Sequence, residues 1–117
     1  KADQLFHQII SDATKNGAMV ASVEQLWALR TSTEEIIDDY GAVCNSGVDK
    51  TIAEHRAVYE ALKAHDASRA RAAMHTHFNR LINTLFDAIE ARALEEVRRK
   101  NSEKRGLYSI DNFLKNK

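Results

Sequence analysis

Residues 66–93 read DASRARAAMHTHFNRLINTLFDAIEARA, and this stretch has the clearest periodicity in the chain. Its large apolar side chains recur three or four residues apart, at Met74, Phe78, Leu81, Leu85 and Ile89. This spacing places them in one stripe along a helix, so the stretch predicts a long amphipathic helix with one face against a core. Asp66 or Ser68 is the expected N-cap. We expect the helix to run from Ala67 to at least Ala93, or on past Lys100, and to be broken at Arg105-Gly106.

The remainder of the chain also predicts helices. The 117 residues include no proline, and 44% are hydrophobic and 29% charged, which is typical of a globular helical domain. Further helices are expected at about 3–15, 18–31, 34–40 and 48–64, and residues 107–114 are expected to form a short terminal helix or an ordered tail. Asn16-Gly17 is a helix stop, and residues 41–47 are expected to form a loop. The predicted fold class is therefore all-α, an antiparallel helical bundle of about six or seven helices within a single domain, residues 1–117.

Composition excludes several classes of protein. No apolar run approaches the roughly 18 residues that span a bilayer, and no signal-peptide pattern is present. The formal net charge is zero, which disfavours direct binding of nucleic acid by these residues. Cys44 is the single cysteine and cannot form an internal disulfide, as expected for a reduced, cytoplasmic protein. The chain starts at Lys1, directly in helix-forming sequence, and we expect it to be part of a longer protein.

The histidines are the strongest candidates for functional residues in this sequence, because imidazole is a common metal ligand. There are five of them, at positions 7, 55, 65, 75 and 77. At about 100° per residue, His55 shares a helix face with Val58 and Leu62, and His77 shares one with Met74, so both point toward the core. His75 lies about 200° around the helix from His77 and is expected to point outward.

Asp3 and His7 lie four residues apart, on one face of the first expected helix. With His55 and His77 they form an Asp-His-His-His set that suits Zn²⁺, or Ni²⁺, Mn²⁺ or Fe²⁺. From periodicity alone, hydrogen-bonded core histidines and a surface Asp–His pair remain open alternatives.

Three segments in order resemble a known family. Asp3–His7 matches a D-x-x-F-H opening, and residues 54–62, EHRAVYEAL, match an E-H-R-x-[IV]-x-E-A-[IL] motif. Residues 66–78 match D-x-x-x-A-R-x-A-M-x-x-H-[LF]. Together they resemble the FadR-type C-terminal ligand-binding (FCD) domain of GntR-superfamily transcription regulators, over about Asp3 to Ile89.

The resemblance implies a metal site and a regulatory role. In the metal-binding branch of the family, the ligands correspond to Asp3, His7, His55 and His77 of this sequence. The family implies a small carboxylate effector beside the metal, a homodimer, and an N-terminal winged helix-turn-helix domain that binds operator DNA and is not part of these residues.

The effector residues and the effector itself follow less directly. Arg30, which follows Trp27 on an expected helix, is the first candidate for holding the far end of a carboxylate ligand, and Tyr59, Arg80 and Thr84 are further candidates. Residues 13–18 and 24–30, together with the charged tail at 93–105, resemble uronate-responsive regulators, which implies a hexuronate or related sugar acid. Other hydroxy acids, dicarboxylates and amino acids stay open.

Two other functional classes compete with a regulator. A metalloenzyme would use the same ligands, but the sequence has no HExxH motif, and Glu54 and Glu60 lie off the His55 face, so we expect no enzyme. A metal-free helical interaction module is the second alternative.

Overall fold

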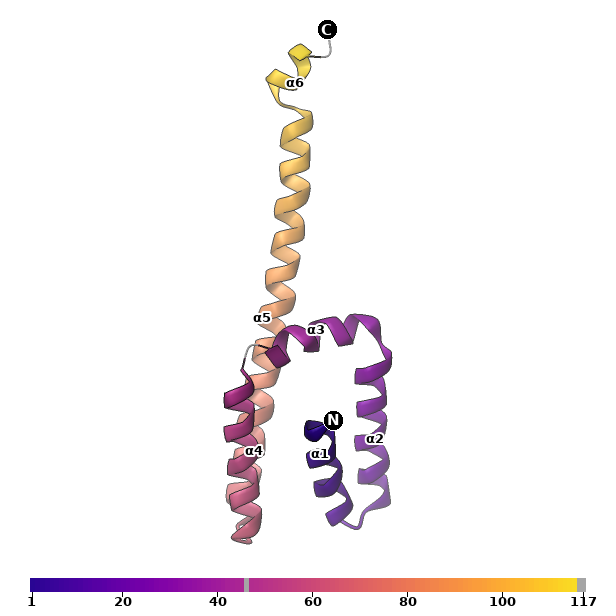
Figure 1. The fold of residues 1–117 in the computed structure, drawn as a ribbon, viewed down its shortest axis with the longest axis vertical. Coiled ribbons are helices and arrows are strands. Elements are labelled where there is room, and N and C mark those ends of the chain that lie inside the picture. Colours follow the sequence, from indigo (N-terminus) through magenta and orange to yellow (C-terminus); the bar gives the residue numbers. More distant parts are fainter. Residues whose placement is uncertain (46, 116–117) are drawn as a thin grey trace. The chain divides into compact units, whose positions relative to one another are not determined.

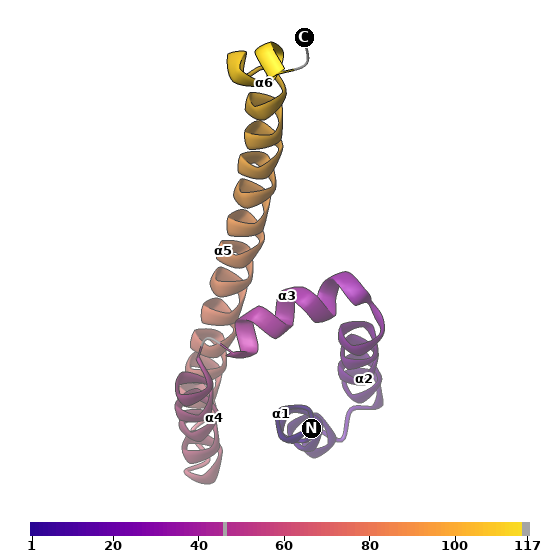
Figure 2. The ribbon, with the colours of Figure 1, turned by 45° about the horizontal axis from the view of Figure 1, so that its top comes forward.

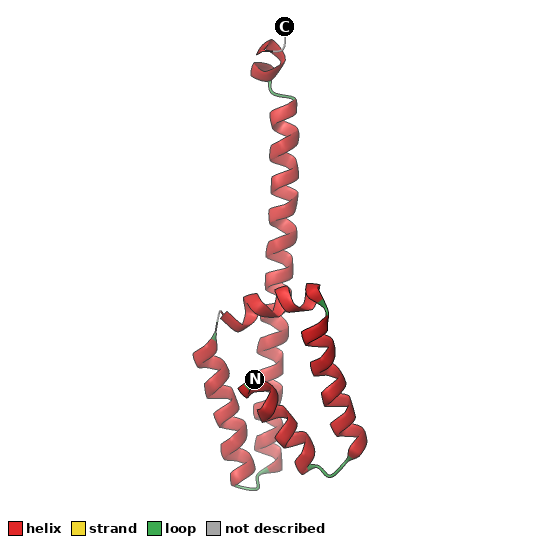
Figure 3. Ribbon diagram, turned by 45° about the vertical axis from the view of Figure 1, so that its right-hand side comes forward, coloured by secondary structure: helices red, strands yellow, loops and turns green. Residues whose placement is uncertain are grey.

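The computed structural model describes residues 1–45 and 47–115, and at positions 35, 39, 42, 44, 45, 112, 113 and 115 it describes the backbone alone. The described residues form six α-helices and no strand (Figures 1 and 3). The helices are α1 (Ala2–Ala13), α2 (Gly17–Ser32), α3 (Glu34–Asn45), α4 (Val48–Lys63), α5 (Ala67–Leu107) and α6 (Ile110–Lys115). The predicted all-α class is thus confirmed. The side chain of Cys44 lies outside the described part of the structure.

The chain divides into two compact units, Lys1–Ala42 and Val43–Lys117, which we call the first and the second unit and describe separately. In the first unit α1 and α2 pack against each other. The connection between them turns at Lys15, whose φ of 55° lies in the left-handed region. Asn16 then caps α2, because its side chain accepts hydrogen bonds from the backbone N–H groups of Ala18 and Met19 at 3.1 and 3.3 Å.

The second unit is built on an antiparallel pair, α4 and the first half of α5, which lie side by side (Figure 2). The tight connection between them uses a left-handed His65, at φ 54°. Asp66 caps α5 by accepting a hydrogen bond from the Arg69 N–H at 2.9 Å, which confirms one of the two predicted caps. Val58 and Ala61 are fully buried on α4, and His77 is fully buried on α5. The apolar side of this hairpin is therefore also the side that carries His77.

Two predicted helix boundaries were wrong. Residues 41–45 belong to α3 rather than to a loop, and α5 passes through Arg105-Gly106 and ends at Leu107, after 41 residues. A glycine inside a helix costs only about 1 kcal/mol relative to alanine, and neighbouring turns offset that cost. In α5 those turns carry ion pairs: the Arg99 guanidinium bonds to the carboxylates of Glu96 and Glu103, three and four residues away.

None of the described helices combines the length and the apolar character that a membrane-spanning segment needs. The distal half of α5 is exposed along its length, as expected for a solvated, charged helix face.

Candidate metal-binding residues

Two of the four predicted metal ligands lie together in the second unit. His55 on α4 and His77 on α5 have ring centres 4.6 Å apart, with the ring planes at 56°. Two imidazoles that bind one ion through bonds of about 2.0–2.1 Å have ring centres about 4.5–5.2 Å apart, for ligand angles from about 90° to the tetrahedral value. The separation of His55 and His77 therefore fits a shared divalent ion.

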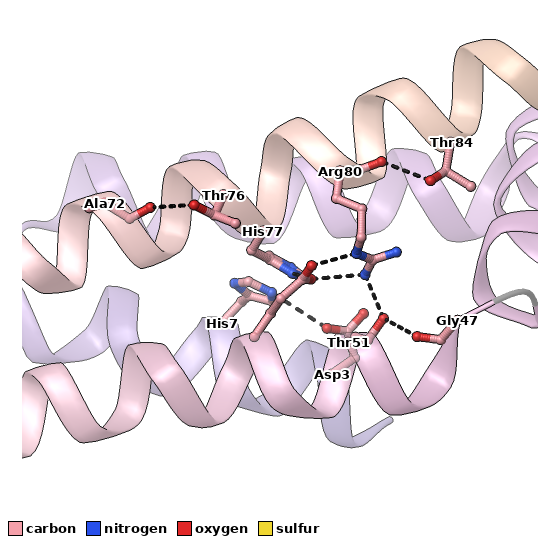
Figure 4. A network of polar contacts seen from close by, with 10 residues as sticks. Asp3, His7, Gly47, Thr51, Ala72, Thr76, His77, Arg80 and Thr84 are labelled. Carbon is pink, nitrogen blue, oxygen red and sulfur yellow. Dashed lines mark hydrogen bonds and ion pairs between the residues drawn. The ribbon is translucent and has the colours of Figure 1, made fainter.

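A chain of hydrogen bonds begins at Nδ1 of the His77 ring and continues to Arg80 and Thr51 (Figure 4). His77 Nδ1 lies 2.8 Å from Glu54 Oε2. The Arg80 guanidinium donates to both oxygens of the same carboxylate, from Nε to Oε1 and from Nη2 to Oε2, the latter at 2.9 Å. Arg80 Nη2 also donates to Thr51 Oγ1 at 2.8 Å, and the Thr51 hydroxyl donates to the Gly47 carbonyl at 3.1 Å. These contacts join the first half of α4 to the first half of α5.

The charges in this chain fix its proton positions. Burial raises the pKa of the Glu54 carboxyl, but hydrogen bonds from Arg80 and His77 outweigh burial, and the pKa falls below its ordinary value. The hydrogen bond to Glu54 likewise raises the pKa of Arg80. An ionised carboxylate only accepts hydrogen bonds, so Nδ1 of His77 carries the proton that points to Glu54. In the neutral ring, Nε2 then presents the lone pair that a metal requires.

The other two predicted ligands lie together in the first unit. His7 Nε2 and Asp3 Oδ1 are 3.4 Å apart, one turn from each other on α1. Two donor atoms on one tetrahedral zinc ion, with bonds of about 2.0–2.1 Å, are separated by about 3.3 Å. The hydrogen bond with His7 is the main cause that lowers the pKa of Asp3 to about 2; burial opposes this shift and Arg30 adds to it. Asp3 is therefore an ionised, ligand-competent carboxylate across the physiological range.

Arg30, predicted to hold an effector, has partners within its own unit. Its Nη1 lies 3.2 Å from Asp3 Oδ2. Its guanidinium carbon stands 4.4 Å from the ring centres of both Trp27 and Tyr40. A planar cation beside two aromatic rings and against a carboxylate is well positioned. Arg30 thus supports the orientation of Asp3 in this structure.

The remaining candidates are placed differently. Arg80 holds Glu54, as described above, and the Thr84 hydroxyl donates to the Arg80 carbonyl at 2.8 Å. Tyr59 is exposed on α4, with the Lys63 ammonium 6.0 Å from its ring centre. His75 is exposed, which confirms the predicted outward direction, and His65 is exposed at the α4–α5 connection.

A protein-family model, described as the FCD domain, matches residues 1–80. The chain belongs to the FCD family. FCD domains are the ligand-sensing, regulatory domains of GntR-type regulators, so the match supports the resemblance seen in the sequence motifs. No curated protein and no solved structure gave a match to the chain.

Sequence reasoning about this FCD domain missed Glu54. It placed Glu54 off the His55 face of α4, and it did not foresee that Glu54 contacts His77 on α5, the residue whose ring centre also lies 4.6 Å from that of His55. A signal was available, because Glu54 opens the E-H-R motif and an adjacent carboxylate is a frequent partner of a metal-binding histidine.

Proposed function

We propose that this FCD domain senses a small carboxylate effector through a divalent metal ion held by Asp3, His7, His55 and His77. One observation carries the proposal: the ring centres of His55 and His77 lie 4.6 Å apart. Glu54 Oε2, 2.8 Å from Nδ1 of His77, leaves Nε2 as the proposed ligand atom of that ring. Three imidazoles and one carboxylate are ligands that Zn²⁺ favours and that Ni²⁺, Mn²⁺ and Fe²⁺ accept.

The two pairs of ligands come from different units, and we propose that they bind one ion together. The Asp3–His7 separation of 3.4 Å is compatible with this assignment, since it suits two adjacent positions on a tetrahedral ion. On an octahedral ion with the same bond lengths, adjacent ligand atoms would lie about 2.9 Å apart. Four protein ligands leave one position of a five-coordinate ion for a carboxylate, or two positions of a six-coordinate ion for a carboxylate and a neighbouring hydroxyl. A hydroxy-carboxylate such as a hexuronate or a related sugar acid has this arrangement of oxygens.

Within this proposal the metal supplies most of the attraction for the effector's carboxylate, because a divalent cation in a drier cavity attracts an anion more strongly than a solvated lysine does. Arg30, Tyr59, Arg80 and Thr84 are the side chains proposed to contact the effector. Arg30 and Arg80 bond to the carboxylates of Asp3 and Glu54 in this structure, and we propose that their guanidinium groups also bond to the far end of the effector.

Regulation requires that the effector binds one arrangement of the protein more tightly than another. An effector with equal affinity for both arrangements would not change their populations. We propose a homodimeric cytoplasmic regulator, in which the effector changes the placement of an N-terminal winged helix-turn-helix domain on operator DNA.

The test is metal content, measured by inductively coupled plasma mass spectrometry on protein purified without a histidine tag. Wild type should carry about one zinc ion per chain after refilling, and the His55→Ala/His77→Ala variant should carry essentially none. His75→Ala is the matched control, because His75 is exposed on the same helix as His77. Wild-type protein without metal after refilling with zinc, nickel and manganese would refute the proposal.

A second pair of substitutions, Asp3→Asn/His7→Ala, tests whether the two units share the ion. Loss of metal in this variant, as complete as in the His55/His77 variant, is expected for one shared ion. Retention of a full equivalent would place the ion on the second unit alone. Metal-loaded wild type should then show a thermal shift with sugar acids that the metal-free protein lacks.

A further inference from the structure

The packing of α4 against α5 places four polar side chains in a reciprocal arrangement. Thr51 and Glu54 lie three residues apart on α4, and His77 and Arg80 lie three residues apart on α5. Because the helices are antiparallel, Thr51 meets Arg80 and Glu54 meets both His77 and Arg80. Residues three apart share one helix face, so a slip by one residue would break every one of these contacts.

We propose that Glu54, held in place by Arg80, is the positioning residue that sets the tautomer and the direction of His77 and so prepares it to bind metal. This inference rests on the proposed metal site. It extends that site by two residues that do not touch the ion and by a hydrogen-bonded anchor at Thr51.

The geometry assigns each member of the network a separate task. Glu54 accepts the Nδ1 proton at 2.8 Å, which leaves Nε2 of His77 as the donor atom. Arg80 contacts both carboxylate oxygens, which fixes the rotation of the carboxylate as well as its charge. Thr51 holds Arg80 and is itself held by the Gly47 carbonyl, so the guanidinium is tied to the first turn of α4.

Burial makes this arrangement necessary. The His77 side chain is 1% exposed and the Glu54 side chain 14% exposed, so water has little access to orient either group. A buried imidazole without a fixed partner would populate both tautomers, and the one protonated on Nε2 cannot bind metal through that atom. Glu54 therefore selects the competent form before the ion arrives.

The experiment compares Glu54→Ala and Glu54→Gln with Glu60→Ala, which removes an exposed carboxylate from the same helix. The first readout is the His77 tautomer in metal-free protein, by nitrogen-15 NMR of labelled histidine. Wild type and Glu60→Ala should show Nδ1 protonated, and Glu54→Ala should show a mixture of tautomers.

The second readout is zinc affinity, by competition with a chromophoric chelator. Glu54→Ala should bind zinc about 10–100-fold more weakly than wild type. Glu54→Gln keeps the shape of the side chain and should lose less, and Arg80→Met should fall between Glu54→Ala and wild type. Circular dichroism checks that the variants fold, and Glu54→Gln provides the comparison if the alanine variant does not.

The outcomes separate this inference from the proposed function. Unchanged tautomer and unchanged zinc affinity in both Glu54 variants would overturn the role of Glu54 and leave the metal site standing. A wild type that binds no zinc would overturn the metal site, whereas the tautomer measurement in metal-free protein would still decide whether Glu54 positions His77.

Discussion

Replacing Arg30 by methionine should destabilise the first unit substantially, although Arg30 lies on α2, a helix without fully buried residues. Its side chain is 24% exposed, and its guanidinium is placed between Trp27 and Tyr40 and against Asp3. Methionine retains an unbranched apolar stem of similar length and removes the charge and the planar group. The loss therefore measures the guanidinium contacts rather than the packing of the stem.

The expected magnitude follows from the three contacts. Each cation–π contact at a partly exposed position contributes on the order of 0.5–1 kcal/mol. The ion pair with Asp3 contributes about 0.2–1 kcal/mol, because the Asp3 side chain is more than one third exposed and solvent screens the pair. Together these contacts amount to about 2 kcal/mol, or a roughly 30-fold change in the ratio of folded to unfolded first unit.

Trp27 makes the measurement direct, because it is the single tryptophan of the chain and lies in the first unit. Urea unfolding followed by its fluorescence should give a lower midpoint for Arg30→Met at unchanged slope. Arg30→Lys keeps the charge without the planar group and should lose about half as much. Arg71→Met, at an exposed position of α5, is the control and should stay within about 0.5 kcal/mol of wild type. If Arg30→Met lowered the free energy of unfolding by no more than about 0.5 kcal/mol, the structural role of Arg30 would be refuted. If the same variant also lost effector binding, Arg30 would be assigned to effector binding alone.

Further predictions concern packing, helix propensity and acid. Val58 is fully buried on α4, so Val58→Ala leaves a cavity and should lower the free energy of unfolding of the second unit by about 2 kcal/mol. Urea unfolding monitored by circular dichroism measures this loss, and a loss below about 0.5 kcal/mol would contradict the α4–α5 core. Gly106→Ala should slow hydrogen exchange in the last turns of α5 through a gain of about 0.5–1 kcal/mol, because an added Cβ meets no atom within 4 Å; faster exchange would show that the helix ends earlier. Folding lowers the pKa of Asp3 from 3.8 to about 2, so the ionised carboxylate stabilises the fold fully above about pH 3.8. This stabilisation is lost as the pH falls toward 2 and the carboxylate is protonated. The destabilisation caused by Asp3→Asn, about 1 kcal/mol or less after solvent screening, should therefore shrink between about pH 5 and pH 2.5 in the presence of chelator, and a penalty independent of pH would refute the ionic role.

The local sequence pattern was enough to predict features that depend on a single helix, such as its existence, its buried face and its N-cap. The stripe from Met74 to Ile89 predicted α5, and the same period correctly separated buried His77 from exposed His75. The cap at Asp66 depends only on its own turn and was also predicted. The helix ends at Asn45 and Leu107 were missed because the summed propensity of the surrounding turns exceeds the cost of one glycine.

Pattern was not enough where function depends on the register between helices. Glu54 was predicted to lie off the His55 face of α4, yet the antiparallel packing of α5 brings both Glu54 and His55 to His77. In the same way, the contacts of Arg30 with Asp3 and Tyr40 depend on how α1, α2 and α3 pack, and the role of Arg30 at an effector stays a prediction. A helical period gives the direction of a side chain but not the identity of the group it meets.

The distribution of the proposed ligands suggests why a metal suits a sensor of this kind. Asp3 and His7 belong to the first unit, and His55 and His77 belong to the second. Under the proposed assignment, the full binding free energy is available only when both pairs meet the same ion, so metal binding favours one arrangement of the units over the others. An effector that coordinates the same ion adds its own affinity to that arrangement alone, and this difference in affinity is what a regulatory domain needs to shift a population.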